Sequence, residues 1–330
     1  LAMGVALAGV VQLLFQLPSL HTLKLTPRPV WDTRDKGVRK ILALMVPALF
    51  GVSVSQINLL FDTVLASLLP DGSVAWLYYS DRLTELPLGV FAIAIATVIL
   101  PTLSALNTRA DPDAFSKTLV WAIRNVLLIA VPATAALWLL AEPILATLFQ
   151  YGAFSESDVT MAAASLRAYT IGLGAFMLIK VLAPGYYARQ DMKTPVKIGI
   201  IAMVSNMVLN VVFVFPLMWY FDMGHVGLAL ATSVSAWLNA GLLFMGLRRG
   251  GVLLSGLFAG KYALRLLISV MVMAAVLAYA TPSVQEWLAA DVWWRVSHIL
   301  GLVMAGMGAF VVLLAVLGTR LQEIRDPGYH

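Results

Sequence analysis

The sequence has 330 residues, of which 61% are hydrophobic and only 12% charged, with a mean hydropathy of +0.88. A soluble domain carries about 25% charged residues, so this chain cannot cover a water-exposed surface of its size and is expected to be an integral membrane protein. No cysteine is present, which excludes disulfides and thiolate metal sites, and the net charge of +5 forms no basic stripe of the kind that binds nucleic acid.

The chain enters an apolar run directly at Leu1, without an initiator methionine or a basic leader, so we expect a piece of a longer protein. A membrane span needs around 20 apolar residues, whereas a barrel strand is about half as long and alternates with polar residues. The sequence therefore predicts an all-α polytopic membrane protein with nine transmembrane helices: Leu1–Leu17, Ile41–Leu69, Val74–Leu106, Thr118–Leu148, Val159–Ala183, Val196–Tyr220, Val226–Leu247, Tyr262–Ala280 and Val296–Leu317.

The third of these runs is too long for one straight span. It contains Pro87, which lacks a backbone donor, so we expect the helix to kink or break there.

Basic residues predict the orientation. Most Lys and Arg lie in one alternating set of gaps, and the opposite set contains Arg295 alone. Because cytoplasmic loops are enriched in Lys and Arg, the first gap and the C-terminal tail are expected to be cytoplasmic. Two connecting segments, Val252–Ala263 and Val284–Trp294, are expected to lie in the membrane interface, the second with Trp287, Trp293 and Trp294 in the outer aromatic belt.

Motifs for catalysis are weak. The segment GLFAGK lacks the spacing and the hydroxyl residue of a phosphate-binding loop. Asp111 and Asp113 could hold a divalent cation for a polyprenyl-phosphate transferase, but a solvated turn explains them better, because the sequence offers no further ligand nearby. The sequence therefore favours a protein that is not an enzyme.

Charged residues inside the spans are the candidate binding site, because each is costly in a membrane unless it is paired or hydrated. Counted from Asp71 in the outer gap, Arg82 lies about 16 Å deep at 1.5 Å per residue, near the middle of the membrane. Its permanent charge suits a phosphate or diphosphate, while pairing with Glu85 would neutralise it structurally, and spacing alone leaves the two readings even. Tyr79 and Asp81 cluster around Arg82, and Arg167 is a second deep arginine.

An oxygen-rich set forms a second candidate. Asp62, Asn206, Asn210 and Thr232 lie at depths that let three helices converge them on a Na⁺ ion. Interhelical hydrogen bonding is the simpler alternative, and a proton held by Asp62 is another. Further polar residues of the same spans are Gln56, Asn58, Ser233 and Ser235.

Three collinear segments carry a family resemblance. The segment VSQINLLFDTVLASLLPDGSVAWLYYSDRLTELPLGVFAIAIATVILPTLS, then LFQYGAF, then KVLAPGYYARQDMKTPVKI resemble the MurJ (MviN) family of lipid II flippases. The resemblance implies a fourteen-helix protein of the MOP exporter superfamily, of which this chain covers helices six to fourteen.

The same resemblance implies a domain division. Residues 1–20 would be the last helix of a truncated first lobe, and residues 21–40 a basic cytoplasmic linker. Residues 41–247 would form a complete, MATE-like six-helix second lobe. Residues 248–330 would hold an interfacial segment, two extra C-terminal helices that form a lipid groove, and a cytoplasmic tail.

The function that the resemblance implies is movement of lipid II, an undecaprenyl-diphosphate-linked disaccharide-pentapeptide, from the inner to the outer leaflet of the bacterial cytoplasmic membrane for peptidoglycan synthesis. Arg82 matches the family's cavity arginine, with Glu85 as its neighbour. The partners would be lipid II, membrane lipid and the missing N-terminal lobe. No cofactor is expected, and coupling to Na⁺, protons or membrane potential stays open, as does a different MOP-type exporter of drugs or polysaccharide lipids.

Overall fold

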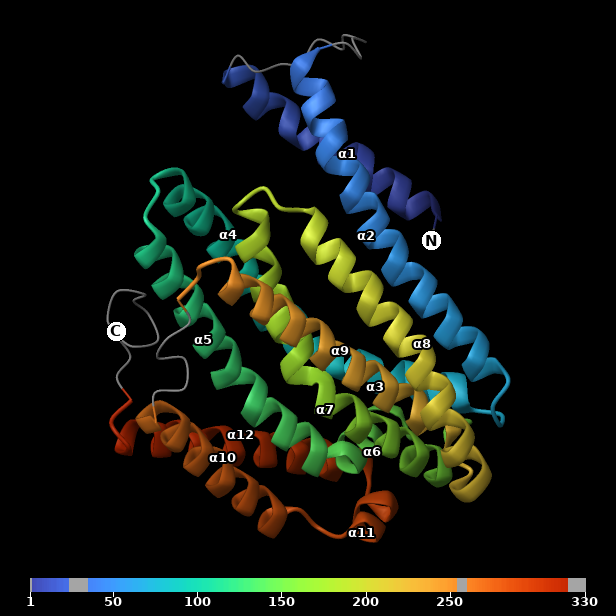
Figure 1. Ribbon diagram of the computed structural model, residues 1–330. Coiled ribbons are helices and arrows are strands. Elements are labelled where there is room, and N and C mark those ends of the chain that lie inside the picture. The colour runs from blue at the N-terminus through green and yellow to red at the C-terminus, as the bar shows by residue number, and fades with distance from the viewer. Residues whose placement is uncertain (1, 24–34, 254–259, 320–330) are drawn as a thin grey trace. The chain divides into compact units, whose positions relative to one another are not determined.

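The computed structural model describes residues 2–23, 35–253 and 260–319, and every regular element in these ranges is a helix (Figure 1). It divides into two compact units, Leu1–Val46 and Pro47–His330. The first unit holds α1 (Ala2–Thr22) and the start of α2 (Lys36–Ser67), and the remaining helices belong to the second. Three predicted segments lie partly outside the described residues: the basic linker at 24–34, the first interfacial segment at 254–259 and the tail at 320–330.

The prediction of an all-α membrane protein is confirmed, because seven helical segments in the described ranges are long and apolar enough to cross a membrane. Neither α1 nor α2 is among the seven, so the total of nine spans stays a prediction. The seven segments are Ser73–Thr108, Pro112–Leu139, Glu156–Tyr187, Lys193–Phe221, Gly224–Arg249, Lys261–Ala280 and Val292–Val316.

The predicted irregularity at Pro87 is confirmed as a change of helix type. Helix α3 (Ser73–Pro87) ends at the proline, a π-helical turn η1 (Leu88–Ala92) follows, and α4 (Ile93–Thr108) completes the span. Proline cannot donate to the preceding turn, and a π turn accommodates the displaced backbone within a continuous helix.

The predicted single span Thr118–Leu148 is wrong, because it consists of two helices. Helix α5 (Pro112–Leu139) and helix α6 (Ala141–Phe149) are separated at Leu140, whose backbone leaves helical geometry at φ −95° and ψ 15°. Pro143 lies in the first turn of α6, where its missing N–H costs nothing, but it could not continue the hydrogen bonding of α5. Pro143 was the sequence signal for this junction, and the prediction of a single apolar run passed over it.

Helix α5 begins with an aspartate cap. Asp111 accepts a hydrogen bond from the backbone N–H of Ala114 at 3.0 Å, and Pro112 occupies the first helical position. This cap is worth about 1 kcal/mol and gives the Asp111 carboxylate a structural role. The alternative of a polyprenyl-phosphate transferase needed this carboxylate as a cation ligand, and the cap explains its presence without a cation.

Three long helices of the second unit pack in a row: α7 (Glu156–Tyr187) against α9 (Gly224–Arg249), and α9 against α8 (Lys193–Phe221). Small residues set their close approach. A Cβ added at Gly172 would lie 2.8 Å from the Cα of Ser233, and one at Gly227 would lie 2.8 Å from the Cα of Val214. Such contacts replace the hydrophobic effect as the main attraction between helices in a membrane.

The turn between α7 and α8 is closed by Asp191, whose Oδ1 accepts a hydrogen bond from the backbone N–H of Thr194 at 3.0 Å. Partial burial opposes ionisation of Asp191, but the hydrogen bonds from Thr194 and the charge of Lys197 outweigh it and lower the pKa of this carboxyl below its ordinary 3.8.

The C-terminal helices α10 (Gly260–Ala280) and α12 (Val292–Val316) pack against each other and against α5 and α6 (Figure 1). The short helix α11 (Val284–Ala289) joins them. The prediction that Trp287 lies in an outer aromatic belt is wrong, because its side chain is 1% exposed and its Nε1 donates to Thr147 Oγ1 at 3.1 Å.

Arg295, the basic residue that the sequence places in the outer gaps, has a structural role. Arg295 is buried and donates to the carbonyl oxygens of Ala146 at 3.1 Å and Leu288 at 2.7 Å, in the last turns of α6 and α11. A guanidinium at two helix C-termini complements the negative ends of both helix dipoles. Arg295 thereby ties the C-terminal pair to the rest of the second unit.

Candidate functional site

Helix α3 presents an exposed ion pair inside a membrane span. Arg82 Nη1 lies 2.5 Å from Glu85 Oε2, one turn along the helix, and the two side chains are 54% and 47% exposed. The guanidinium carbon of Arg82 also lies 5.1 Å from the centre of the Tyr78 ring. The predicted pairing of Arg82 with Glu85 is therefore present, yet both charges remain open to a ligand.

The neighbours that the sequence grouped with Arg82 point elsewhere. The ring of Tyr79 packs against Phe149 at 4.4 Å and Phe154 at 5.4 Å between ring centres. Asp81 is half-buried and interacts electrostatically with both Glu85 and Arg82. The exposed face therefore consists mainly of Arg82, Glu85 and Tyr78.

Arg167 has a partner that the sequence did not reveal. Its Nη1 lies 3.1 Å from Oε1 of Glu142 at the start of α6, and its Nε donates to the carbonyl oxygen of Trp138 at 3.3 Å. Both charged side chains are partly buried. Within the described part of the chain, no hydrogen bond or ion pair joins Arg167 to the pair on α3.

The oxygen-rich set does come together, where α2, α8 and α9 meet. Asn210 Nδ2 donates to Asp62 Oδ1 at 2.7 Å, and Asn58 Nδ2 donates to Asp62 Oδ2 at 3.1 Å. Asn206 accepts from Asn210 at 3.2 Å and lies 3.4 Å from Thr232 Oγ1. We call Asp62, Asn58, Asn206, Asn210, Thr232 and Ser235 the polar cluster; Ser235 joins it through a 3.4 Å contact with Asn206 Nδ2.

The polar cluster has buried acceptor atoms that are not used within the described part of the protein. Asn206 and Asn210 are 1% and 0% exposed. The amide oxygens of Asn58 and Asn210 are buried and have no hydrogen-bond partner among the described residues. One carboxylate with several neutral oxygens is a donor set that suits a small hard cation of low charge. In the described ranges, no group of three or more His, Cys, Asp and Glu residues could bind a metal of higher charge.

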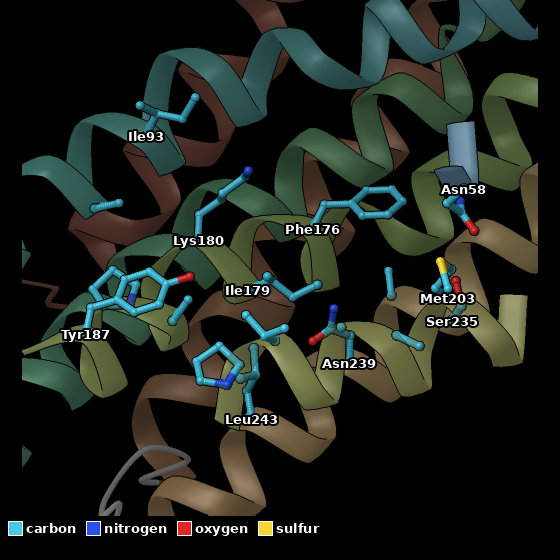
Figure 2. A pocket seen from close by; sticks show the side chains of 18 of the residues that line it. Asn58, Ile93, Phe176, Ile179, Lys180, Tyr187, Met203, Ser235, Asn239 and Leu243 are labelled. Atoms are coloured by element: carbon cyan, nitrogen blue, oxygen red, sulfur yellow. The ribbon is translucent and has the colours of Figure 1, made fainter. Parts of the chain in front are cut away.

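A cavity of about 1070 Å³ adjoins the polar cluster. Figure 2 shows Asn58, Met203 and Ser235 toward one end and Tyr187 and Lys180 toward the other. Its walls come from α4, α7, α8 and α9, with Asn58 from α2, and they are mostly apolar. The sequence gave no signal of this cavity, because its lining residues come from five separate helices.

Comparisons with known proteins agree with this architecture. Residues 1–297 match the protein family described as lipid II flippase MurJ. A probable lipid II flippase MurJ of Vibrio cholerae is 50% identical over 325 residues, which cover 98% of this chain and 61% of that protein. Its counterpart in Haemophilus influenzae is 47% identical over 330 residues, covering 98% of this chain and 63% of the relative. The chain thus spans about three fifths of the length of these relatives.

Solved structures show the same relationship. A lipid II flippase MurJ in an inward closed conformation superimposes with a TM-score of 0.68 at 25% identity, over 89% of this chain and 57% of the other. A MATE protein in a straight conformation superimposes with a TM-score of 0.54 at 17% identity, over 87% of this chain and 67% of the other. The second comparison shows a shared fold alone.

Proposed function

Because the chain belongs to the MurJ family of lipid II flippases, we propose that the protein moves lipid II from the inner to the outer leaflet of a bacterial cytoplasmic membrane. It would act as a transporter rather than an enzyme. Its described helices make it a multi-pass membrane protein, and the basic residues support a cytoplasmic C-terminus.

The exposed pair on α3 is the observation that carries this proposal. A guanidinium cannot lose its proton, and its planar donors match a diphosphate in a bidentate arrangement. Arg82 makes an ion pair with the exposed carboxylate of Glu85, which an incoming diphosphate could replace as its partner. Glu85 would then be released to the sugar or peptide part of the substrate.

The other predicted substrate residues take supporting parts in this proposal. Tyr79 anchors α3 to the end of α6, and Asp81 adds a carboxyl group that interacts electrostatically with Arg82. Arg167, paired with Glu142, would be a second phosphate contact only in a conformation that opens this pair.

Alternating access would carry the headgroup across. Two lobes rock about a central site, so the polar headgroup passes through the protein while the polyprenyl tail stays in lipid. The apolar outer faces of α10 and α12 support a groove for that tail, with exposed side chains that include Leu264, Leu267, Met271, Met304, Met307 and Val311.

The polar cluster supports coupling of this movement to a cation. Asp62 supplies the charge, and Asn206, Asn210 and Thr232 supply neutral oxygens, which favours Na⁺ and leaves a proton on Asp62 as the alternative. Transport measured against Na⁺ at fixed pH, in the parent and in Asp62→Asn, tests this. Absence of Na⁺ stimulation in the parent would exclude Na⁺, and full activity of Asp62→Asn would exclude both ions.

The transport proposal is tested by measuring how much lipid II reaches the outer leaflet in cells depleted of this protein. Lipid II is expected to accumulate on the inner side and to return to the outer leaflet when the protein is restored. Unchanged outer-leaflet lipid II, together with loss of a different exported lipid or drug, would instead support another MOP-type exporter.

A further inference from the structure

The cavity leads from the polar cluster toward the end of the bundle where α7 ends and α8 begins. At 1.5 Å per residue, Lys180 lies about 10 Å from the end of α7, and Asn239 about 15 Å from the end of α9. Asn206 lies about 20 Å from the start of α8. All three line the cavity, which therefore extends through about half of the membrane thickness.

Polar side chains occur at each of these depths in an otherwise apolar lining. Tyr187 and Lys180 lie near the mouth, Asn239 lies farther in, and Ser235 lies at the polar cluster (Figure 2). Neither Asn239 nor Lys180 makes a side-chain hydrogen bond or ion pair with another residue that the structure describes. Polar groups at membrane depth that lack protein partners need water, and the volume of 1070 Å³ accommodates it, at about 30 Å³ per molecule.

We propose that this cavity is a water-filled vestibule through which a small cation passes between the polar cluster and the cytoplasm. The inference rests on the proposed cation coupling and adds the side of the membrane to which the site opens. Of the described residues that line the vestibule, Lys180 alone is charged. Its positive charge lowers the occupancy of cations along the route, so the carboxylate of Asp62 is the position at which a cation is held.

Cysteine accessibility tests the vestibule directly, because the chain has no cysteine of its own. Val196→Cys probes the mouth and Asn239→Cys the middle of the cavity. Leu238→Cys is the matched control, since Leu238 lies at the same depth on α9 but outside the cavity. In inside-out membrane vesicles, a charged thiol reagent is expected to modify the first two positions at least tenfold faster than the third.

A bulky side chain placed inside the cavity tests whether reagents reach Asn239 through it. Gly199 lines the cavity, and a Cβ added there meets no atom within 4 Å, so Gly199→Phe can project its ring into the open space without a clash. It is expected to slow modification of Asn239→Cys at least tenfold and to leave Val196→Cys unaffected. Gly241→Phe is the matched control, because a Cβ there also meets nothing within 4 Å but the residue does not line the cavity.

Three results would overturn the vestibule. Asn239→Cys could be as unreactive as Leu238→Cys, as it would be if a lipid chain filled the cavity. Gly199→Phe could leave the modification rate of Asn239→Cys unchanged, or the positions could react only from outside. Labelling depends neither on the transported lipid nor on the coupling ion. Failure of the lipid II proposal or of cation coupling would therefore leave these rates unchanged, and either can be told apart from failure of the vestibule.

Discussion

Replacing Arg82 by alanine or lysine separates its binding role from its structural role. The ion pair with Glu85 has both side chains about half exposed, and exposed pairs of this kind contribute about 0.2–1 kcal/mol to stability. Arg82→Ala is therefore expected to lower the melting temperature of the purified protein by no more than a few degrees.

The expected loss of transport is much larger. A hydrogen bond to a charged group contributes about 1.5–3 kcal/mol, and 1.4 kcal/mol corresponds to a tenfold change in affinity. Loss of one such bond to a diphosphate should therefore reduce transport by about 10- to 100-fold. Arg82→Lys keeps the charge but loses the planar fork, so its transport should fall nearly as far as that of Arg82→Ala.

The assay is appearance of lipid II in the outer leaflet at matched protein levels, with melting temperatures measured on the same variants. Arg248→Ala, an exposed arginine at the end of α9, is the control and should transport normally. Normal transport by Arg82→Ala would refute the binding role. A loss of stability that parallels the loss of transport would show that the ion pair is structural.

Three further outcomes are expected. A Cβ added at Gly306 would lie 3.0 Å from a leucine of α10, and overpacking costs about 1–3 kcal/mol, so Gly306→Trp should slow transport and lower the melting temperature. A Cβ added at Gly301 would meet no atom within 4 Å, so Gly301→Trp should change neither transport nor the melting temperature. Because the pKa of Asp191 is lower in the folded protein than its ordinary value of 3.8, ionised Asp191 stabilises the fold above pH 3.8. This stabilisation is lost as the pH falls through the lowered pKa. The difference in melting temperature between the parent and Asp191→Asn should therefore become smaller progressively below pH 3.8. An impermeant thiol reagent added outside intact cells should label Ser157→Cys but not Asp113→Cys, and the reverse would overturn the orientation.

Sequence patterns predicted the parts of this fold that depend on local chemistry. The lengths of the apolar runs located the spans, and Pro87 located the change of helix type. Both effects depend only on residues that are close together in the sequence. The division between α5 and α6 was missed, since hydropathy averages over a single non-helical residue such as Leu140. Trp287 was misplaced because a tryptophan near a helix end serves equally well as an interface anchor or as a buried side chain.

The candidate site was also only partly predictable from the sequence. Asn206 and Asn210 are one turn apart, so a shared face with Asp62 could be inferred from spacing and estimated depth. The partner of Arg167 could not be inferred, because Glu142 is brought to it by the position of α6 rather than by sequence distance. The cavity likewise depends on how five helices pack, which no single segment encodes.

The π-helical turn after Pro87 has a consequence for the rotational phase of its span. An α-helix turns by about 100° per residue, and a π turn takes in one residue more than an α turn. Leu88–Ala92 therefore sets the angle between the face of α3 that carries Arg82 and the face of α4 that lines the cavity through Ile93 and Thr97. Removing one residue would rotate these faces by about 100° relative to each other, although none of the five lines the cavity. The length of this segment thus aligns the face of the span that carries Arg82 with the face that lines the cavity.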